Sequence, residues 1–271
     1  MAVTNFIRTI WDAELKQALA KKLVSQYFVN HNYEGAIIGA GSVKINQLAD
    51  VTLRDYDGNE ITVDDMSTTD TTLLINHEKY FAVKVDDVDT VQAAGDLRSP
   101  LVNNGATRIA EDEDAYVFNT MATEGTLAVG NSAAISVTDA ASAKKFLLAM
   151  KTAADKANVP ADGRVFVAPY EFENYLLSDT TINLAAPTAN DTLKAGYVGK
   201  LYGIEIYSSN NCPTGKAILT TPLFTTEARQ LQNIEAIRSE KYFKDVVRGL
   251  SVSGVKVTQA AGVIVGAVNF Q

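Results

Sequence analysis

Residues 54–70 restrict the fold of this chain more than any other segment, because they are acidic and contain few apolar side chains. Segments with the composition of β-strands flank them at 36–48 and 72–87. The turn sequence Asp57-Gly58-Asn59 lies between the two flanks. A long hairpin without a core of its own is marginally stable in isolation. We therefore expect residues 34–85 to form an extended β-hairpin that lies on another surface.

The charge of the chain is concentrated in the same region. The chain has 24 basic and 32 acidic residues, a net charge of −8, and residues 34–90 alone carry 12 acidic and 4 basic side chains. Residues 1–33 and 216–271 are net basic. One interpretation is a chance fluctuation on a solvated hairpin. The other is an acidic hairpin that contacts a basic surface of an adjacent copy, since complementary patches steer association and fix register. Head-to-tail contacts of that kind build rings or extended assemblies.

Under the second interpretation, the candidate contact residues come from the N-terminal helix, the hairpin and a basic segment near the C-terminus. They are Trp11 and Leu15; Arg54, Asp55, Asp57, Glu60, Asp64 and Asp65; and Arg238, Lys241, Lys244 and Arg248.

Outside the hairpin, the pattern predicts alternating helices and strands. Apolar residues spaced by three and four predict an amphipathic helix over 11–29 and further helix within 86–122. The acidic run 111–114 is interpreted as a solvated helix face, with a metal cluster as the alternative. Thr138 or Asp139 can cap a helix that runs to about Ala157. The remaining predictions are strands at 164–168, 201–209, 216–220, 246–258 and 261–270, and a helix at 170–177 that Pro169 opens.

The residues that usually carry catalysis are scarce. Cys212 is the single cysteine, which excludes an internal disulfide and a thiolate cluster. His31 and His77 lie far apart and are interpreted as structural. We therefore predict no catalytic residue, cofactor or metal, and a protein that is not an enzyme. One alternative from another class stays open: a cytosolic dinucleotide-binding enzyme that uses Gly39 and Gly41, although Lys44 stands where that motif needs its third glycine.

The sequence contains no pattern that predicts export or membrane insertion. Residues 1–9 lack the cationic and apolar regions of a signal peptide. The longest apolar run, 260–268, is far shorter than the ~20 residues of a membrane-spanning helix. Net acidity also disfavours a nucleic-acid-coating protein. We expect the protein to be made and kept in a cytoplasm until it is released.

Five segments, in this order along the chain, resemble the major capsid proteins of tailed bacteriophages, which have the Hong Kong 97 type α+β shell fold. They are NYEGAIIGAGSVKI, HEKYFAVKVDDVDTVQA, GRVFVAPYEFENYLLSD, YVGKLYGIEIYSSNNCP and EKYFKDVVRGLSVSGVKV. The resemblance implies an N-terminal arm at 1–33, an extended loop at 34–85, and a spine helix with peripheral domain at 86–137. It also implies an axial domain at 138–245 and return strands of the peripheral domain at 246–271.

The resemblance also implies a function. Such a subunit self-assembles as hexamers and pentamers into an icosahedral head, inside the host cytoplasm, and a portal and packaging motor fill that head with double-stranded DNA. An encapsulin-like bacterial nanocompartment shell protein is the nearest alternative. Some relatives crosslink through a lysine in the extended loop, but residues 54–66 contain no lysine, so we do not expect crosslinking. Because only some 33 residues precede the loop, we expect a separate scaffolding protein.

Overall fold

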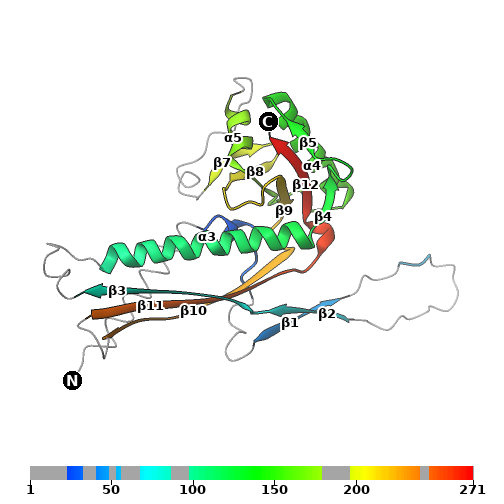
Figure 1. Cartoon of the computed structure of the whole chain (residues 1–271). Helices are drawn as coiled ribbons and strands as arrows, with labels where there is room; N and C mark the ends of the chain where they lie inside the picture. Colours follow the sequence, from blue (N-terminus) through cyan, green and yellow to red (C-terminus); the bar gives the residue numbers. More distant parts are fainter. Residues whose placement is uncertain are drawn as a thin grey trace.

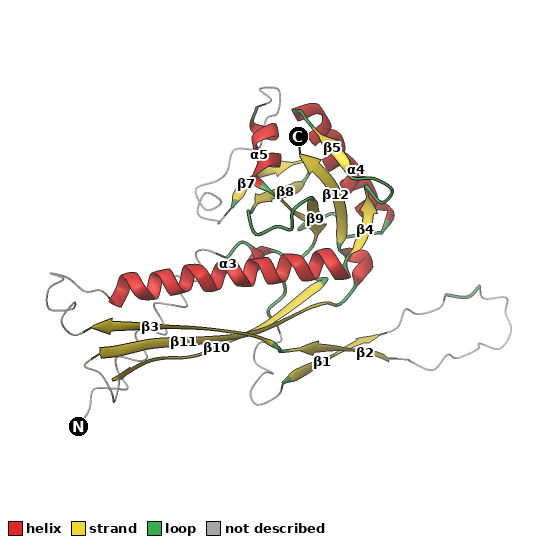
Figure 2. Ribbon diagram, viewed as in Figure 1, coloured by secondary structure: helices red, strands yellow, loops and turns green. Residues whose placement is uncertain are grey.

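The computed structural model describes residues 23–32, 41–48, 53–55, 68–86, 98–178, 196–238 and 244–270. These residues form a globular part built on a seven-stranded sheet and an elongated part built on helix α3 and narrower sheets (Figures 1 and 2). In the described ranges, no helix is long and apolar enough to cross a membrane.

The globular part contains a mixed sheet in the order β4-β12-β9-β6-β8-β7, with β5 beside the far half of β12. The strands are β4 (Thr126–Val129), β5 (Ile135–Val137), β6 (Val165–Ala168), β7 (Tyr197–Leu201), β8 (Ile204–Ser208), β9 (Lys216–Thr220) and β12 (Ile264–Phe270). Helices α4 (Ala140–Lys156) and α5 (Tyr170–Leu177) pack on this sheet through buried Phe146, Met150 and Phe172. Burial of each such side chain contributes about 2 kcal/mol, so this cluster stabilises the globular part.

Local sequence signals account for both helices. Asp139 is the N-cap of α4: its carboxylate accepts from the Ser142 backbone N–H, and the Ser142 hydroxyl oxygen accepts from the Asp139 N–H. This reciprocal capping satisfies two of the amide groups that a helix start leaves unpaired. Pro169 stands at the N-cap of α5. The predictions of a capped helix ending near residue 157 and of a Pro169-opened helix are confirmed.

The elongated part pairs three long antiparallel strands in the order β10-β11-β3. They are β3 (His77–Asp86), β10 (Thr225–Arg238) and β11 (Lys244–Val257). Helix α3 (Arg98–Glu124) lies along this sheet (Figure 1). Val117, Phe118 and Met121 of α3 share a buried cluster with Val255 and Val257 of β11.

A short antiparallel hairpin of β1 (Ser42–Leu48) and β2 (Thr68–Leu74) extends from the junction with β3 (Figure 2). Its base buries Val43, Ile45, Leu73 and Ile75 against Ala228 of β10, with Val252 of β11 packed beside them. Of the described residues of the hairpin predicted over 34–85, β1 and β2 pair as expected and are seated on the long sheet. The prediction is wrong for residues 77–85, because β3 pairs with β11 and is itself a strand of the long sheet.

Residues 23–32 cross between the two parts as an irregular segment. They contain one turn of 3-10 helix, Ser25–Tyr27, and a single bridge between Asn30 and Thr226. The predicted α-helix over 11–29 is therefore wrong for residues 23–29, because buried contacts to α3 and the sheets replace helical hydrogen bonding there. Residues 11–22 of that prediction lie outside the described residues.

The two sheets divide the chain differently from the boundary predicted at residue 245. Strand β10 belongs to the long sheet with β3, whereas β12, from the segment 246–271, lies inside the seven-stranded sheet. Strand β10 was not predicted at all. Its sequence, TTEARQLQNIEAIR, contains helix-favouring residues, and pairing with β11 overrides that local preference.

Candidate functional site

The far end of the β1–β2 hairpin exposes an apolar side chain beside charged ones. The strands pair out to Leu48 and Thr68, and residues 53–55 follow in the described part of the chain. Leu53 is 94% exposed, and Arg54 and Asp55 are exposed as well. Of the other hairpin candidates, Asp57, Glu60, Asp64 and Asp65 lie outside the described residues.

The opposite end of the long sheet gathers the basic candidates. In the strand register, Lys244 is opposite Asp86 of β3, and Arg238 is opposite Asp245 of β11. Arg248, which is exposed, lies four residues further along β11, opposite Ala82. Lys241, like Trp11 and Leu15, falls outside the described residues. The pairing thus brings Arg238, Lys244 and Arg248 to one region, and their contact role stays a prediction.

The hairpin and the basic candidates lie on opposite sides of the elongated part, with strand β3 between them. Strand β3 begins at His77, three residues after β2 ends at Leu74, and finishes at Asp86 beside Lys244. Its ten residues span about 33 Å at the usual rise of a strand. Figure 1 shows β1 and β2 at one side of the molecule and the paired ends of β3 and β11 at the other. The described candidates Arg54 and Asp55 therefore belong to the hairpin side of the elongated part, and Arg238 and Lys244 to its other side.

The acidic run of α3 lies at the junction of all these elements and is not a solvated face. Glu113 and Asp114 are each 2% exposed. The Asp114 carboxylate accepts from the backbone N–H groups of Val24 (3.2 Å) and Ser25 (2.9 Å). The Glu113 carboxylate accepts from the Ser251 hydroxyl (2.7 Å) and lies 3.4 Å from Arg229 Nη1. The solvated-face interpretation is wrong for both residues, because their carboxylates join α3 to residues 23–32, β10 and β11.

Of the two remaining carboxylates of the run, Asp112 contacts β3 and Glu111 is exposed. Asp112 Oδ2 lies 2.6 Å from Nε2 of His77 on β3, and Lys79 Nζ is 3.4 Å from Oδ1. The His77 ring stacks on Tyr116, with ring centroids 4.0 Å apart. Glu111 pairs with Arg108 on the exposed side of the helix. His77 thus has structural contacts on two sides, which fits the structural interpretation of this histidine.

Burial raises the pKa values of the two buried carboxyl groups, Glu113 and Asp114. Desolvation raises the pKa of Glu113 above its ordinary value and outweighs the opposing attraction of Arg229. Desolvation likewise raises the pKa of Asp114, although the Ser25 and Val24 amide groups oppose it. The folded state therefore holds protons on these two groups more tightly than the unfolded chain does.

Solved structures of other proteins match this chain. No protein-family model matches the sequence, and no curated protein matches it either. A solved structure from Mycobacterium phage Che8 is 31% identical, covers 92% of this chain and 91% of its own, and superposes with a TM-score of 0.74. A capsid structure of cyanophage P-SCSP1u, 15% identical, covers 86% of this chain and 85% of its own with a TM-score of 0.64. The chain belongs to the major capsid proteins of tailed bacteriophages.

The fold of this capsid protein also matches a particle of another source. A virus-like particle from Pyrococcus furiosus has a subunit that covers 98% of this chain and 100% of its own, with a TM-score of 0.61 and 11% identity. Identity at that level shows a shared fold and nothing finer. The phage match at 31% identity favours the phage family over a nanocompartment shell.

Sequence reasoning missed several surface residues of the capsid protein. Tyr80 of β3 is 80% exposed and pairs across the sheet with Leu250. The signal was the alternation along the strand, which places Tyr80 on the face opposite Phe81. Nothing in the sequence around Leu53, apart from its acidic neighbours, indicated that this side chain would be exposed.

The structure gives no support to the dinucleotide alternative. Gly41 is followed directly by strand β1, whereas a phosphate-binding turn opens a helix at that point. Gly39 lies outside the described residues. Within the described ranges of the capsid protein, no three His, Cys, Asp or Glu side chains gather as a metal site would require. Cys212 is buried, and burial raises the pKa of its thiol to about 12, so it is a poor nucleophile.

Proposed function

We propose that this protein is the shell subunit of an icosahedral phage head, assembled from hexamers and pentamers, and that it performs no catalysis. The observation that carries the proposal is that the chain belongs to the capsid family, and the opposite net charges of residues 34–90 and 216–271 support it. Within one copy, the length of β3 separates the β1–β2 hairpin from the paired positions of Arg238 and Lys244. They can meet between copies, head to tail.

In this proposal, the acidic hairpin of one copy lies on the basic end of its neighbour. Trp11 and Leu15 of the N-terminal arm add a second, apolar contact between copies. We divide the subunit into an arm, an extended loop, a spine, a peripheral domain and an axial domain. In this proposal each part contacts neighbouring copies in the shell. We assign β10 to the peripheral part, because it pairs with β11, and β12 to the axial part, because it lies in the seven-stranded sheet.

The proposed partners follow from the same shell. Copies of this chain form the wall, a separate scaffolding protein and a portal guide its assembly in the host cytoplasm, and double-stranded DNA fills the virion. A net charge of −8 supports a wall that does not grip the packed DNA, since like charges repel. A nanocompartment shell is the second candidate, supported by the Pyrococcus particle; terminase and portal genes beside the coding sequence would exclude it.

The decisive experiment is negative-stain microscopy with sedimentation velocity on purified full-length protein, with and without a candidate scaffolding protein. We expect closed shells, tubes, or rings of hexamers and pentamers. A monodisperse monomer under every condition would overturn the proposal.

A further inference from the structure

A groove of about 680 Å³ lies between α4 and the edge of the seven-stranded sheet. Ala149, Thr152, Ala153 and Lys156 form its helical wall, spaced by three and four so that they share one face of α4. The opposite wall comes from β4 and its following Gly130. Small side chains on both walls leave room for a main chain with modest side chains to lie between them.

Strand β4 is an open edge in the described part of the chain. It pairs with β12 on one side and ends the strand order of the sheet on the other. Thr126, Leu127 and Ala128 are exposed, and the strand contains neither a charged residue nor a proline. Charged residues and prolines are common devices that stop an edge from pairing with another chain. An extended segment can therefore align with this edge by the mode in which peptides add to sheets.

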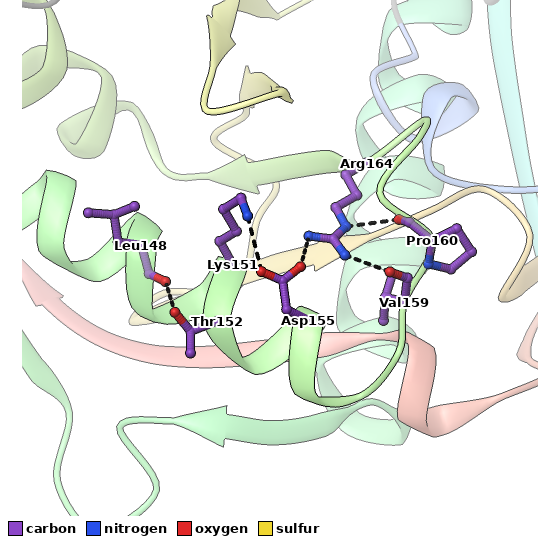
Figure 3. A network of polar contacts seen from close by, with 7 residues as sticks. All are labelled: Leu148, Lys151, Thr152, Asp155, Val159, Pro160 and Arg164. Atoms are coloured by element: carbon purple, nitrogen blue, oxygen red, sulfur yellow. Dashed lines mark hydrogen bonds and ion pairs between the residues drawn. The ribbon is translucent and has the colours of Figure 1, made fainter.

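The helix that walls the groove is basic, although the whole protein is acidic. Helix α4 has four lysines and one acidic residue, Asp155. That carboxylate is already engaged: Lys151 Nζ lies 3.0 Å from it and Arg164 Nη1 lies 2.6 Å from it (Figure 3). Arg164 is held in turn by the carbonyl groups of Val159 and Pro160. Lys156, next in the chain and on the groove wall, has no ion-pair partner among the described residues.

We propose that this groove binds an acidic, extended segment of a different protein, laid along β4 with small aliphatic side chains toward α4 and carboxylates toward Lys156. The acidic residues of this chain are concentrated in 34–90, which the head-to-tail contact engages, so another copy is not the occupant. The inference concerns a separate surface, and its choice of a different protein as occupant rests on the proposed head-to-tail contact.

Fluorescence anisotropy of the unassembled full-length subunit tests the proposal with two labelled peptides. One alternates aspartate with valine and alanine, and the other replaces every aspartate with lysine. We expect saturable binding of the acidic peptide, at least about tenfold tighter than that of the basic one. Lys156→Glu should weaken it by about tenfold. Lys200→Glu is the matched control: it makes the same charge change on exposed β7, at the opposite edge of the sheet, and should leave binding unchanged.

Thr152→Trp fills the groove from an exposed helical position, where a folding defect is not expected, and should abolish binding. Equal binding of both peptides, or binding that survives Thr152→Trp and Lys156→Glu, would overturn the proposal. Sedimentation velocity of wild type and Thr152→Trp supplies the remaining outcome. If the substitution changes self-association, a second copy occupies the groove, and the assignment to a different protein is wrong.

Discussion

At the scale of single residues, Asp114 connects the segment 23–32 to the spine helix. Its carboxylate receives the two amide groups that the chain presents at Val24 and Ser25, in a site closed to water. Buried amide groups without an acceptor cost about 1–3 kcal/mol each. The carboxylate therefore determines where residues 23–32 can lie, although it belongs to a helix 89 and 90 positions away in sequence.

Replacing this carboxylate should loosen the segment. We expect Asp114→Ala to lower the free energy of unfolding by about 2 kcal/mol, because two buried N–H groups lose their acceptor. Urea denaturation measures the loss, and amide hydrogen exchange should show faster exchange at Val24 and Ser25. Glu111→Ala, which removes an exposed carboxylate from the same run, should change stability by less than about 0.5 kcal/mol. Unaltered exchange at Val24 and Ser25 in Asp114→Ala would contradict the role given to Asp114.

Glu113 should make stability depend on pH. Its pKa in the folded state is raised above the ordinary 4.5 by burial, so the folded protein binds this proton more tightly than the unfolded chain. The contribution of this proton binding to the free energy of unfolding is then greatest below pH 4.5. It is lost as the pH rises from 4.5 through the raised pKa. We expect Glu113→Gln to remove this loss. The free energy of unfolding of the wild type should therefore fall relative to that of the variant as the pH increases across that window. Urea denaturation at several pH values measures it. A difference that is constant with pH would show that Glu113 does not titrate there.

The buried positions of this acidic run could have been predicted from spacing. Buried residues of α3 recur at Ala106, Ala110, Val117 and Met121, and the positions 113 and 114 fill the gap between 110 and 117. The sequence interpretation gave the type of residue priority over its place on the helix. The partners could not have been predicted, because they come from Val24, Ser25 and Ser251, which are distant in sequence.

At the scale of elements, the hairpin depends on its seat on the long sheet. The base of β1–β2 lies over Gly254 of β11, where a Cβ atom would meet the main chain at Leu74 and Ile75. Backbone atoms cannot rotate away as a flexible side chain can. Glycine at this position is therefore what allows the hairpin to approach the sheet so closely.

A side chain at this glycine should displace the hairpin. We expect Gly254→Val to destabilise the protein by about 1–3 kcal/mol, as overpacking does elsewhere, and to speed amide exchange throughout β1 and β2. Gly41→Ala is the matched control, because a Cβ atom at that position would have nothing within 4 Å among the described residues. Hydrogen exchange with mass spectrometry separates the two variants. Protection of β1 and β2 that equals wild type in Gly254→Val would rule out the seat as the contact that fixes the hairpin.

The elements that sequence reasoning predicted are those whose signals are local. The Asp139 cap, the Pro169 helix start and the alternating strand β3 can be inferred from a few adjacent residues. Strand β10 forms because its backbone pairs with β11. Strands β4 and β5 likewise form by pairing with β12. Such pairings are set by the whole fold and are absent from any short window of sequence.

At the scale of the whole molecule, the head-to-tail contact predicts that charge reversal at one end can be compensated at the other. The acidic-end variant changes four hairpin residues to lysine: Asp55, Asp57, Asp64 and Asp65. The basic-end variant changes four residues to glutamate: Arg238, Lys241, Lys244 and Arg248. Each alone places like charges at the contact, and like charges disfavour association. We expect each to impair assembly while the circular dichroism of the subunit stays nearly unchanged.

The variant that combines both reversals separates the contact from bulk charge. It keeps the wild-type net charge of −8 and presents a basic hairpin to an acidic sheet end, so it should assemble again. Microscopy and sedimentation of all four proteins, at low and at high salt, measure the effect. High salt should narrow the differences, because exposed charges are screened beyond about 10 Å at 0.1 M ionic strength. Normal assembly of either single-end variant, or failure of the combined one, would show that some other surface organises the shell.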